Sequence, residues 1–336
     1  MEIKEAISCI VDRQDLTDAE MQGVMRQIMS GGATPIQIGG FLAGLRTKGE
    51  TVEEITAAAR VMRELATAVQ VRRERLVDTC GTGGDGQSIF NVSTGAAFVA
   101  AAAGARVAKH GNRSMSSKSG SADVLEAMGV KLEIPPDRVA ECIDTIRLGF
   151  MFAPAHHAAA RHAAAPRREL GTRTLFNLLG PLTNPAGAPN QLLGVFSQRW
   201  LEPLAKVLRA LGSEHVLVVH SEDGLDEISI AAPTHVTELQ AGSIRSYSIK
   251  PEDFGIQRRP LDTLVVDSPA QCLALIQGVF DGATGPAHDM LVLNAGAAIY
   301  AAGVAETLAA GMDRARAAIA DGGAARKLRQ LKEATQ

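Results

Sequence analysis

The hydrophobic and polar positions of this chain follow two patterns, and the change falls near residue 70. Residues 2–68 predict about four short helices and no strand. Thr-x-x-Glu capping patterns at 17–20 and 51–54, and Thr34 ahead of a proline, mark helix starts. The first part of the chain is therefore predicted to be a small all-helical unit.

From residue 71 onward, short apolar runs alternate with helical stretches. Strands are predicted at 76–79, 106–109, 191–196 and 215–220, and an antiparallel or edge pair at 236–239 and 244–249. Helices are predicted at 91–103, 121–128, 136–148, 172–179, 201–211, 269–279, 289–301 and 304–332. This alternation indicates a mainly parallel central sheet flanked by helices. We therefore predict an α/β protein with a helical domain over 1–70, joined by helices from about 165–185, and an α/β domain over 71–336.

Composition narrows the class of protein. The chain has 336 residues, 46% hydrophobic and 21% charged, which is typical of a globular protein. Its net charge of -3 gives no basic excess for a nucleic-acid surface. The four cysteines form no C-x-x-C pair and are expected to be reduced thiols. The start of the chain lacks a signal-peptide pattern, and the longest apolar stretch, 95–105, is too short to cross a bilayer. We expect a soluble, cytoplasmic protein.

The strongest chemical signal is a glycine-rich loop between a strand and a helix. Residues 76–79 enter the sequence Gly-Thr-Gly-Gly-Asp-Gly at 81–86, and a helix is predicted from Asn91. Glycines let backbone N–H groups turn toward a ligand, and a helix start adds unpaired N–H groups. Ser93 and Thr94 place hydroxyls at that start. The loop fits neither the Walker nor the dinucleotide pattern, so it indicates a phosphate cradle of another kind.

Two further polar loops follow predicted strands. Residues 109–117 hold two cations, an asparagine, a glycine and three serines, a set that suits a sugar phosphate or diphosphate. Residues 223–227 place Asp226 and Glu227 after a glycine turn, where both carboxylates can face one Mg²⁺ ion whose remaining ligands are phosphates. Because ligands bind beyond the carboxyl ends of parallel strands, all three loops are expected on one rim of the sheet.

Two other groups of residues are less informative by themselves. Arg167 can pair a planar carboxylate bidentately, although a surface ion pair is the alternative. His156, His157 and His162 have no cysteine or carboxylate at ligand spacing, so we expect them to line a pocket or face solvent.

Taken together, these motifs resemble the anthranilate phosphoribosyltransferase family of tryptophan biosynthesis, nearly end to end. The matching segments are G-T-G-G-D at 81–85, N-V-S-T at 91–94, K-H-G-N-R-S-x-S-S at 109–117, S-G-S-A-D at 119–123, F-A-P at 152–154, R-x-E-L-G-x-R-T-x-F-N-L-L-G-P-L-x-N-P at 167–185 and D-G-x-D-E at 223–227. The resemblance implies that the anthranilate amine displaces pyrophosphate from 5-phosphoribosyl 1-diphosphate in a Mg²⁺-dependent reaction. It also implies a site in a cleft between the two domains and a homodimer formed through the helical domain.

The resemblance assigns roles to particular residues. Lys109, Asn112 and Arg167 are expected to be catalytic, and Gly81, Asn112 and Arg167 to face anthranilate. Ser93, Asp226 and Glu227 are expected to bind Mg²⁺, with two ions per chain. The residues expected to hold the diphosphate substrate are Gly81, Gly84, Asp85, Asn91, Val92, Ser93, Thr94, Lys109, His110, Gly111, Asn112, Arg113, Ser114, Met115, Ser116, Ser117 and Ser121.

The chain departs from the family pattern at two places. Ile89 replaces a serine or threonine, so no hydroxyl contact is expected there, and Ala165-Pro166 replaces Pro-Val just before Arg167. Two alternatives stay open: a pyrimidine nucleoside phosphorylase, whose chains are longer and whose phosphate loop differs, and a non-catalytic nucleic-acid-binding relative. The acidic charge balance and the Asp226-Glu227 pair oppose the second alternative.

Overall fold

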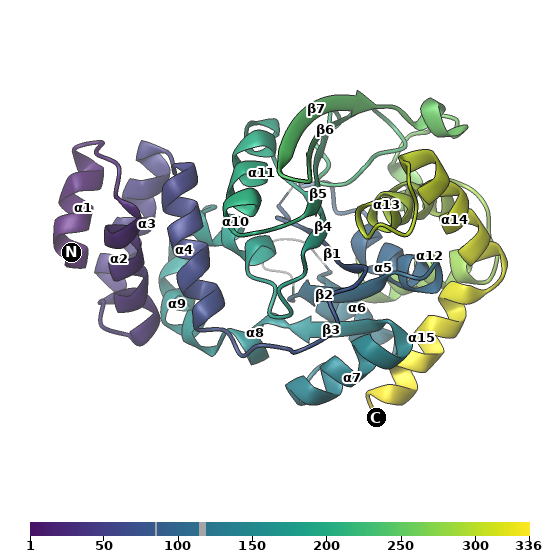
Figure 1. Ribbon diagram of the computed structural model, residues 1–336, viewed down its shortest axis with the longest axis horizontal. Helices are drawn as coiled ribbons and strands as arrows, with labels where there is room; N and C mark the ends of the chain where they lie inside the picture. Colours follow the sequence, from purple (N-terminus) through teal and green to yellow (C-terminus); the bar gives the residue numbers. More distant parts are fainter. Residues whose placement is uncertain (85, 114–118) are drawn as a thin grey trace.

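The computed structural model describes residues 1–84, 86–113 and 119–336. Figure 1 shows the N-terminal helices as a bundle at one end of the molecule, and a central sheet with further helices on both sides. The predicted fold class is confirmed: a helical bundle stands beside a larger α/β unit whose sheet is mostly parallel.

Side-chain capping explains where three helices of the bundle begin. The hydroxyls of Thr17, Thr34 and Thr51 each accept a hydrogen bond from the backbone N–H three residues further on. Two later helices pack against this bundle, α9 against α2 and α3, and α10 against α4. The bounds are α1 Ile3–Val11, α2 Asp18–Ser30, α3 Pro35–Lys48, α4 Val52–Glu64, α9 Arg161–Leu170 and α10 Leu175–Leu182.

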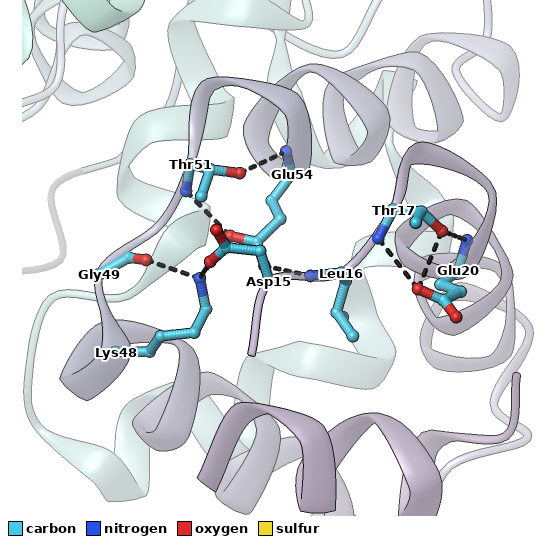
Figure 2. Close-up of polar contacts among 8 residues, drawn as sticks. All are labelled: Asp15, Leu16, Thr17, Glu20, Lys48, Gly49, Thr51 and Glu54. Atoms are coloured by element: carbon cyan, nitrogen blue, oxygen red, sulfur yellow. Dashed lines mark hydrogen bonds and ion pairs between the residues drawn. The ribbon is translucent and has the colours of Figure 1, made fainter. Parts of the chain in front are cut away.

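A buried ion pair ties two loops of the bundle together. Figure 2 shows the Lys48 ammonium between the carboxylates of Asp15 and Glu54, at 2.5 and 3.0 Å. Glu54 is fully buried and also accepts hydrogen bonds from the backbone N–H groups of Leu16 and Thr51. Because a buried carboxylate is costly unless it is paired, this network fixes the loop before α2 against the loop before α4.

Seven strands form one sheet in the order β3-β2-β1-β4-β5-β6-β7. Strands β1 to β5 are paired in parallel. Strand β6 runs antiparallel to both of its neighbours, β5 and β7, which confirms the predicted antiparallel pair. The bounds are β1 Leu76–Gly81, β2 Arg106–Gly111, β3 Leu148–Phe152, β4 Asn190–Gly194, β5 His215–Ser221, β6 Thr234–Gln240 and β7 Ser243–Ile249. The chain moves outward from β1 to β3 and then returns to β4 on the other side of β1, so the strand order reverses between β1 and β4.

The two faces of the sheet belong to different parts of the core. On one face Val77 and Leu192 pack with α5 (Val92–Ala102) and α13 (Pro286–Ala301). On the other, Leu193 and Val218 pack with α11 (Leu201–Ala210) in a core that continues into the bundle. The remaining helices are α6 Ser121–Ala127, α7 Pro136–Ile146, α8 Ala153–His156, α12 Pro269–Phe280, α14 Leu308–Ala320 and α15 Gly323–Ala334. None of the helices in the described part of the chain has the length and apolar character that crossing a membrane requires.

The structure corrects two predicted helices. The helix predicted over 136–148 ends at Ile146, because Arg147 adopts a left-handed conformation with φ of 64°, and the unpredicted strand β3 begins at the next residue, Leu148. The single helix predicted over 304–332 is two helices. The first, α14, ends at Ala320, and Gly322, in a left-handed conformation with φ of 69°, separates it from α15.

Candidate active site

Asp226 lies against the ends of β1 and β4, the two strands between which the strand order reverses. A Cβ added to Gly81, at the end of β1, would lie 2.3 Å from Asp226 Oδ2. One added to Gly194, at the end of β4, would lie 1.5 Å from the Asp226 backbone oxygen. Both positions therefore require glycine, since any side chain would displace Asp226 from the strand ends. The predicted coming together of the glycine loop and the acidic loop is confirmed here.

The two acidic residues face different parts of the glycine loop region. Asp226 Oδ2 accepts a hydrogen bond of 2.7 Å from the backbone N–H of Gly83. Glu227 Oε1 accepts one of 3.3 Å from the backbone N–H of Ser93, in the first turn of α5. The acids are thus held where the glycine loop and a helix N-terminus meet.

Lys109 supplies buried positive charge beside these acids. Its ammonium donates 2.5 Å to the carbonyl of Thr79 and 3.2 Å to Ser93 Oγ, and its exposed fraction is 3%. Burial lowers the pKa of Lys109, while the carboxylates of Asp78 and Glu227 oppose that effect. A cation held among carbonyl and hydroxyl oxygens in this way is suited to attract a phosphate group.

Residues 111–113, at the end of β2 and just after it, are held in place by contacts with α6. Gly111 packs so closely that a Cβ there would lie 2.2 Å from Ser121 Oγ. The Asn112 carbonyl accepts a hydrogen bond from Ser121 Oγ, and its side-chain oxygen accepts one from the Arg113 N–H. Arg113 in turn pairs with Asp123 and Glu126 on α6. Asp85 and Ser114, Met115, Ser116 and Ser117, all predicted to hold substrate, lie outside the described residues.

The opposite wall carries an arginine and two neutral histidines. Burial lowers the pKa of Arg167, whose guanidinium lies 4.9 Å from the centre of the Phe176 ring. Burial also lowers the pKa of His110 to about 3 and that of His157 to about 4, so both rings are neutral at pH 7. Their ring centres are 5.1 Å apart, and the Nε2 atoms of both are buried without a hydrogen-bond partner in the described part of the chain.

These walls enclose one cavity of about 730 Å³. It contains the predicted site residues Gly81, Gly84, Asn91, Val92, Ser93, Lys109, His110, Gly111, Asn112, Arg113, Ser121, Arg167, Asp226 and Glu227. Thr94 is different, because it is fully buried and does not line the cavity. Ile89, the residue that departs from the family pattern, lines the cavity with an apolar side chain.

Sequence reasoning missed the specific roles of His157 and Phe176 in this wall. The Arg167 guanidinium lies over the Phe176 ring, and the His157 ring contacts that of His110 at an interplanar angle of 56°. The histidines had been expected only to line a pocket or face solvent: His157 does line the cavity, whereas His156 is buried and its Nδ1 lies 2.9 Å from the Thr67 carbonyl. Nothing in the local sequence distinguishes the two histidines, because their surroundings come from distant segments.

Comparison with known families defines the class of protein as a glycosyl transferase. The chain matches two families, one described as "Glycosyl transferase family, helical bundle domain" over residues 4–66 and one as "Glycosyl transferase family, a/b domain" over 73–325. Together they describe the same bundle and sheet that Figure 1 shows.

Individual relatives narrow the class. An anthranilate phosphoribosyltransferase of Thioalkalivibrio sulfidiphilus is 62% identical over 331 residues, 98% of each chain. The anthranilate phosphoribosyltransferase of Thermus thermophilus shares 46% sequence identity with this chain. Its crystal structure superposes with a TM-score of 0.93 over 98% of this chain and 99% of the Thermus chain. A Saccharomyces cerevisiae structure in complex with PRPP and Mg shares the fold, with a TM-score of 0.91 over 99% of this chain and 97% of its own, at 24% identity. The chain belongs to the anthranilate phosphoribosyltransferase family. The two alternatives, a nucleoside phosphorylase and a nucleic-acid-binding relative, are not favoured by these matches.

Proposed function

We propose that the cavity transfers the 5-phosphoribosyl group of 5-phosphoribosyl 1-diphosphate to the amine of anthranilate, with Mg²⁺ bound to the diphosphate. The anthranilate nitrogen forms a bond to the anomeric carbon, the bond from that carbon to the diphosphate oxygen breaks, and the amine proton leaves with solvent. The observation that carries this proposal is the meeting of Asp226, Glu227 and Lys109 with the glycine loop in one cavity. Lys109 and the backbone N–H groups at the start of α5 oppose the negative charge that grows on a leaving diphosphate, and the two carboxylates would do so only through bound Mg²⁺.

The diphosphate substrate is assigned to the strand-end side of the cavity. Lys109 and the first turn of α5 provide positive charge and N–H donors there. The segment from Lys109 to Arg113 adds the amide of Asn112, and Ser121, whose hydroxyl donates to the Asn112 carbonyl, adds a hydroxyl group. Preorganised groups of this kind stabilise a transition state without rearranging during the reaction.

The donor atoms fit a magnesium ion only when a substrate completes the site. Asp226 and Glu227 are hard oxygen ligands, and Ser93 Oγ lies within hydrogen-bond distance of Lys109 Nζ beside them. Among the described residues no group of three or more His, Cys, Asp and Glu side chains could hold a metal by itself. We therefore assign Mg²⁺ to Ser93, Asp226 and Glu227 together with substrate phosphates, two ions per chain. When bound, the ions neutralise the departing diphosphate.

Anthranilate is assigned to the opposite wall. Arg167 is stacked on Phe176 and partly buried, so its guanidinium is placed to hold the anthranilate carboxylate. The neutral ring of His157, which contacts the ring of His110, presents an uncharged surface to an aromatic ring. An aromatic amine is itself neutral at pH 7, so the site has no need for a strong base. Asn112 and Gly81, between the two halves, are proposed to keep the amine near the anomeric carbon.

The cellular form of the protein is also a proposal. We propose a cytoplasmic homodimer in tryptophan biosynthesis, with a helical domain over 1–70 and an α/β domain over 71–336. The bundle supports a pairing surface, because it exposes Ile36 at 87% and Val11 at 69%, large apolar side chains that water does not favour. Light scattering coupled to size-exclusion chromatography would give twice the chain mass for a dimer and a single chain mass for a monomer.

The metal assignment can be tested by replacing both acids. Asp226→Asn with Glu227→Gln is expected to lower kcat/KM about a hundredfold or more at saturating Mg²⁺, because two cation ligands are lost. Glu222→Gln, an exposed acid four residues earlier, serves as the matched control and should retain wild-type activity. If the double variant keeps its activity at limiting Mg²⁺, these residues do not bind the metal.

A further inference from the structure

A second cavity lies outside the proposed catalytic site, where the bundle approaches the sheet. Its volume is about 290 Å³, and its wall includes Arg46 of α3, Arg173 of the α9–α10 connection and Arg199 of the short helix Gln198–Trp200. These three guanidinium groups come from segments more than 25 residues apart in sequence. The fold therefore gathers three positive charges around one small space.

The contacts of the three arginines leave this charge uncompensated. Arg46 donates to the backbone carbonyl of Arg173, and Arg173 donates to the backbone carbonyl of Gly84. Arg173 also lies 4.3 Å from the centre of the Phe196 ring, and Arg199 lies 5.0 Å from the Trp200 ring. All of these partners are neutral. Within the described residues, none of the three guanidinium groups forms an ion pair with a carboxylate.

One acid lies in the wall of the same cavity. Glu50 follows α3, and burial raises the pKa of its carboxyl even though Arg199 and Arg46 oppose that effect. With Glu50 ionised, three arginines and one carboxylate leave a net charge of about +2 around the space, close to the charge of a phosphate group at neutral pH. A carboxylate ligand would balance only half of it.

The wall also holds an unused hydrogen-bond donor. Trp200 has an exposed fraction of 6%, and its indole N–H has no hydrogen-bond partner in the described part of the chain. A buried donor without a partner costs free energy, so an acceptor next to it would be stabilising. An oxyanion supplies such acceptors, and arginine binds phosphate oxygens in a fixed two-point geometry.

We propose that this second cavity, lined by Arg46, Arg173 and Arg199, binds a phosphate group, either inorganic phosphate or the phosphate of a small monoester. The cavity is larger than a phosphate ion, so a short organic group also fits. Because Arg173 also holds the Gly84 carbonyl, the ligand shares one arginine with the glycine loop of the first cavity.

Trp200 gives a direct signal for this site, because it is the only tryptophan in the chain and it lies in the cavity wall. Tryptophan fluorescence is measured during titration with inorganic phosphate, glycerol phosphate and acetate, at constant ionic strength. No substrate and no Mg²⁺ are present, so failure of this test leaves the proposed function untouched. We expect a saturable change with a phosphate ligand and none with acetate at the same concentration. Tighter binding of glycerol phosphate identifies a monoester, and equal affinities identify inorganic phosphate.

Variants separate this cavity from the first one. Arg46→Gln and Arg199→Gln should each weaken phosphate binding about tenfold, which corresponds to about 1.4 kcal/mol. Glu50→Gln should strengthen it severalfold, and the exposed Arg209→Gln, a matched loss of charge on α11, should leave it unchanged. Circular dichroism confirms that each variant is folded. The proposal is overturned if the fluorescence change is not saturable, if acetate matches phosphate, or if wild type, Arg46→Gln and Arg199→Gln bind equally.

Discussion

Replacing Glu238 with glutamine removes a buried charge that ties three strands to a helix. Glu238 is fully buried in β6. Its carboxylate lies 2.9 Å from His215 Nε2 and accepts hydrogen bonds from Tyr247, Tyr300 and two nitrogen atoms of Arg245. These partners come from β5, β7 and α13, so the carboxylate connects the antiparallel edge of the sheet to its covering helix.

The pKa of Glu238 sets the size of the effect. Burial opposes ionisation, but hydrogen bonds from His215, Tyr300, Tyr247 and Arg245 outweigh it and lower the pKa from 4.5 to about 2. At about 1.4 kcal/mol per pKa unit, this corresponds to about 3 kcal/mol of stability. Because the folded-state pKa is depressed, that stability is present above pH 4.5 and is lost as the pH falls toward 2.

Urea unfolding at several pH values measures this directly. The free energy of unfolding of wild type minus that of Glu238→Gln should fall by about 2 kcal/mol between pH 5 and pH 3. The difference between the two proteins isolates Glu238, since all other carboxyl groups titrate in both. Glu306→Gln, an exposed acid, is the control and should differ from wild type by the same amount at both pH values. A wild-type minus Glu238→Gln difference that stays constant from pH 5 to pH 3 would refute the reasoning.

Three further changes test the site and the bundle. Arg167→Ala should raise KM for anthranilate about tenfold and KM for the diphosphate substrate less than twofold in steady-state assays, because the arginine is assigned to the carboxylate; equal changes would contradict that assignment. Gly81→Ala should lower kcat/KM about a hundredfold, since its Cβ would lie 2.3 Å from Asp226 Oδ2, and full activity would show that the aspartate can move without cost. Lys48→Met should lower the free energy of unfolding in urea by about 3 kcal/mol while KM stays unchanged, because Glu54 is left buried and unpaired; an unchanged midpoint would mean that water reaches it.

The arrangement of the main site could be predicted from sequence because its parts carry local signals. Gly81 ends the apolar strand β1 ahead of a helix start, Lys109 lies near the end of β2, and Asp226 stands in the loop that follows β5. A general rule then places them together, since parallel strands end at the same edge of a sheet. No knowledge of distant contacts was needed for that step.

Other features depend on contacts that local sequence does not encode. Strand β3 is buried at all five positions, so Leu148–Phe152 shows no alternation, and it follows a helix with only Arg147 between them. The close packing of Gly194 on Asp226 and the ring contact of His157 with His110 join segments more than 30 residues apart. The second cavity is of the same kind, because its three arginines have no common motif.

The most direct test of the proposed reaction is the fluorescence of anthranilate after mixing with the protein, 5-phosphoribosyl 1-diphosphate and Mg²⁺. A control without metal runs beside it, and released pyrophosphate is measured in both. The account predicts a fall in fluorescence that requires Mg²⁺ and is matched by pyrophosphate release. A folded protein that leaves the fluorescence unchanged with fresh substrates would contradict it and would point to a different acceptor for the pentosyl group.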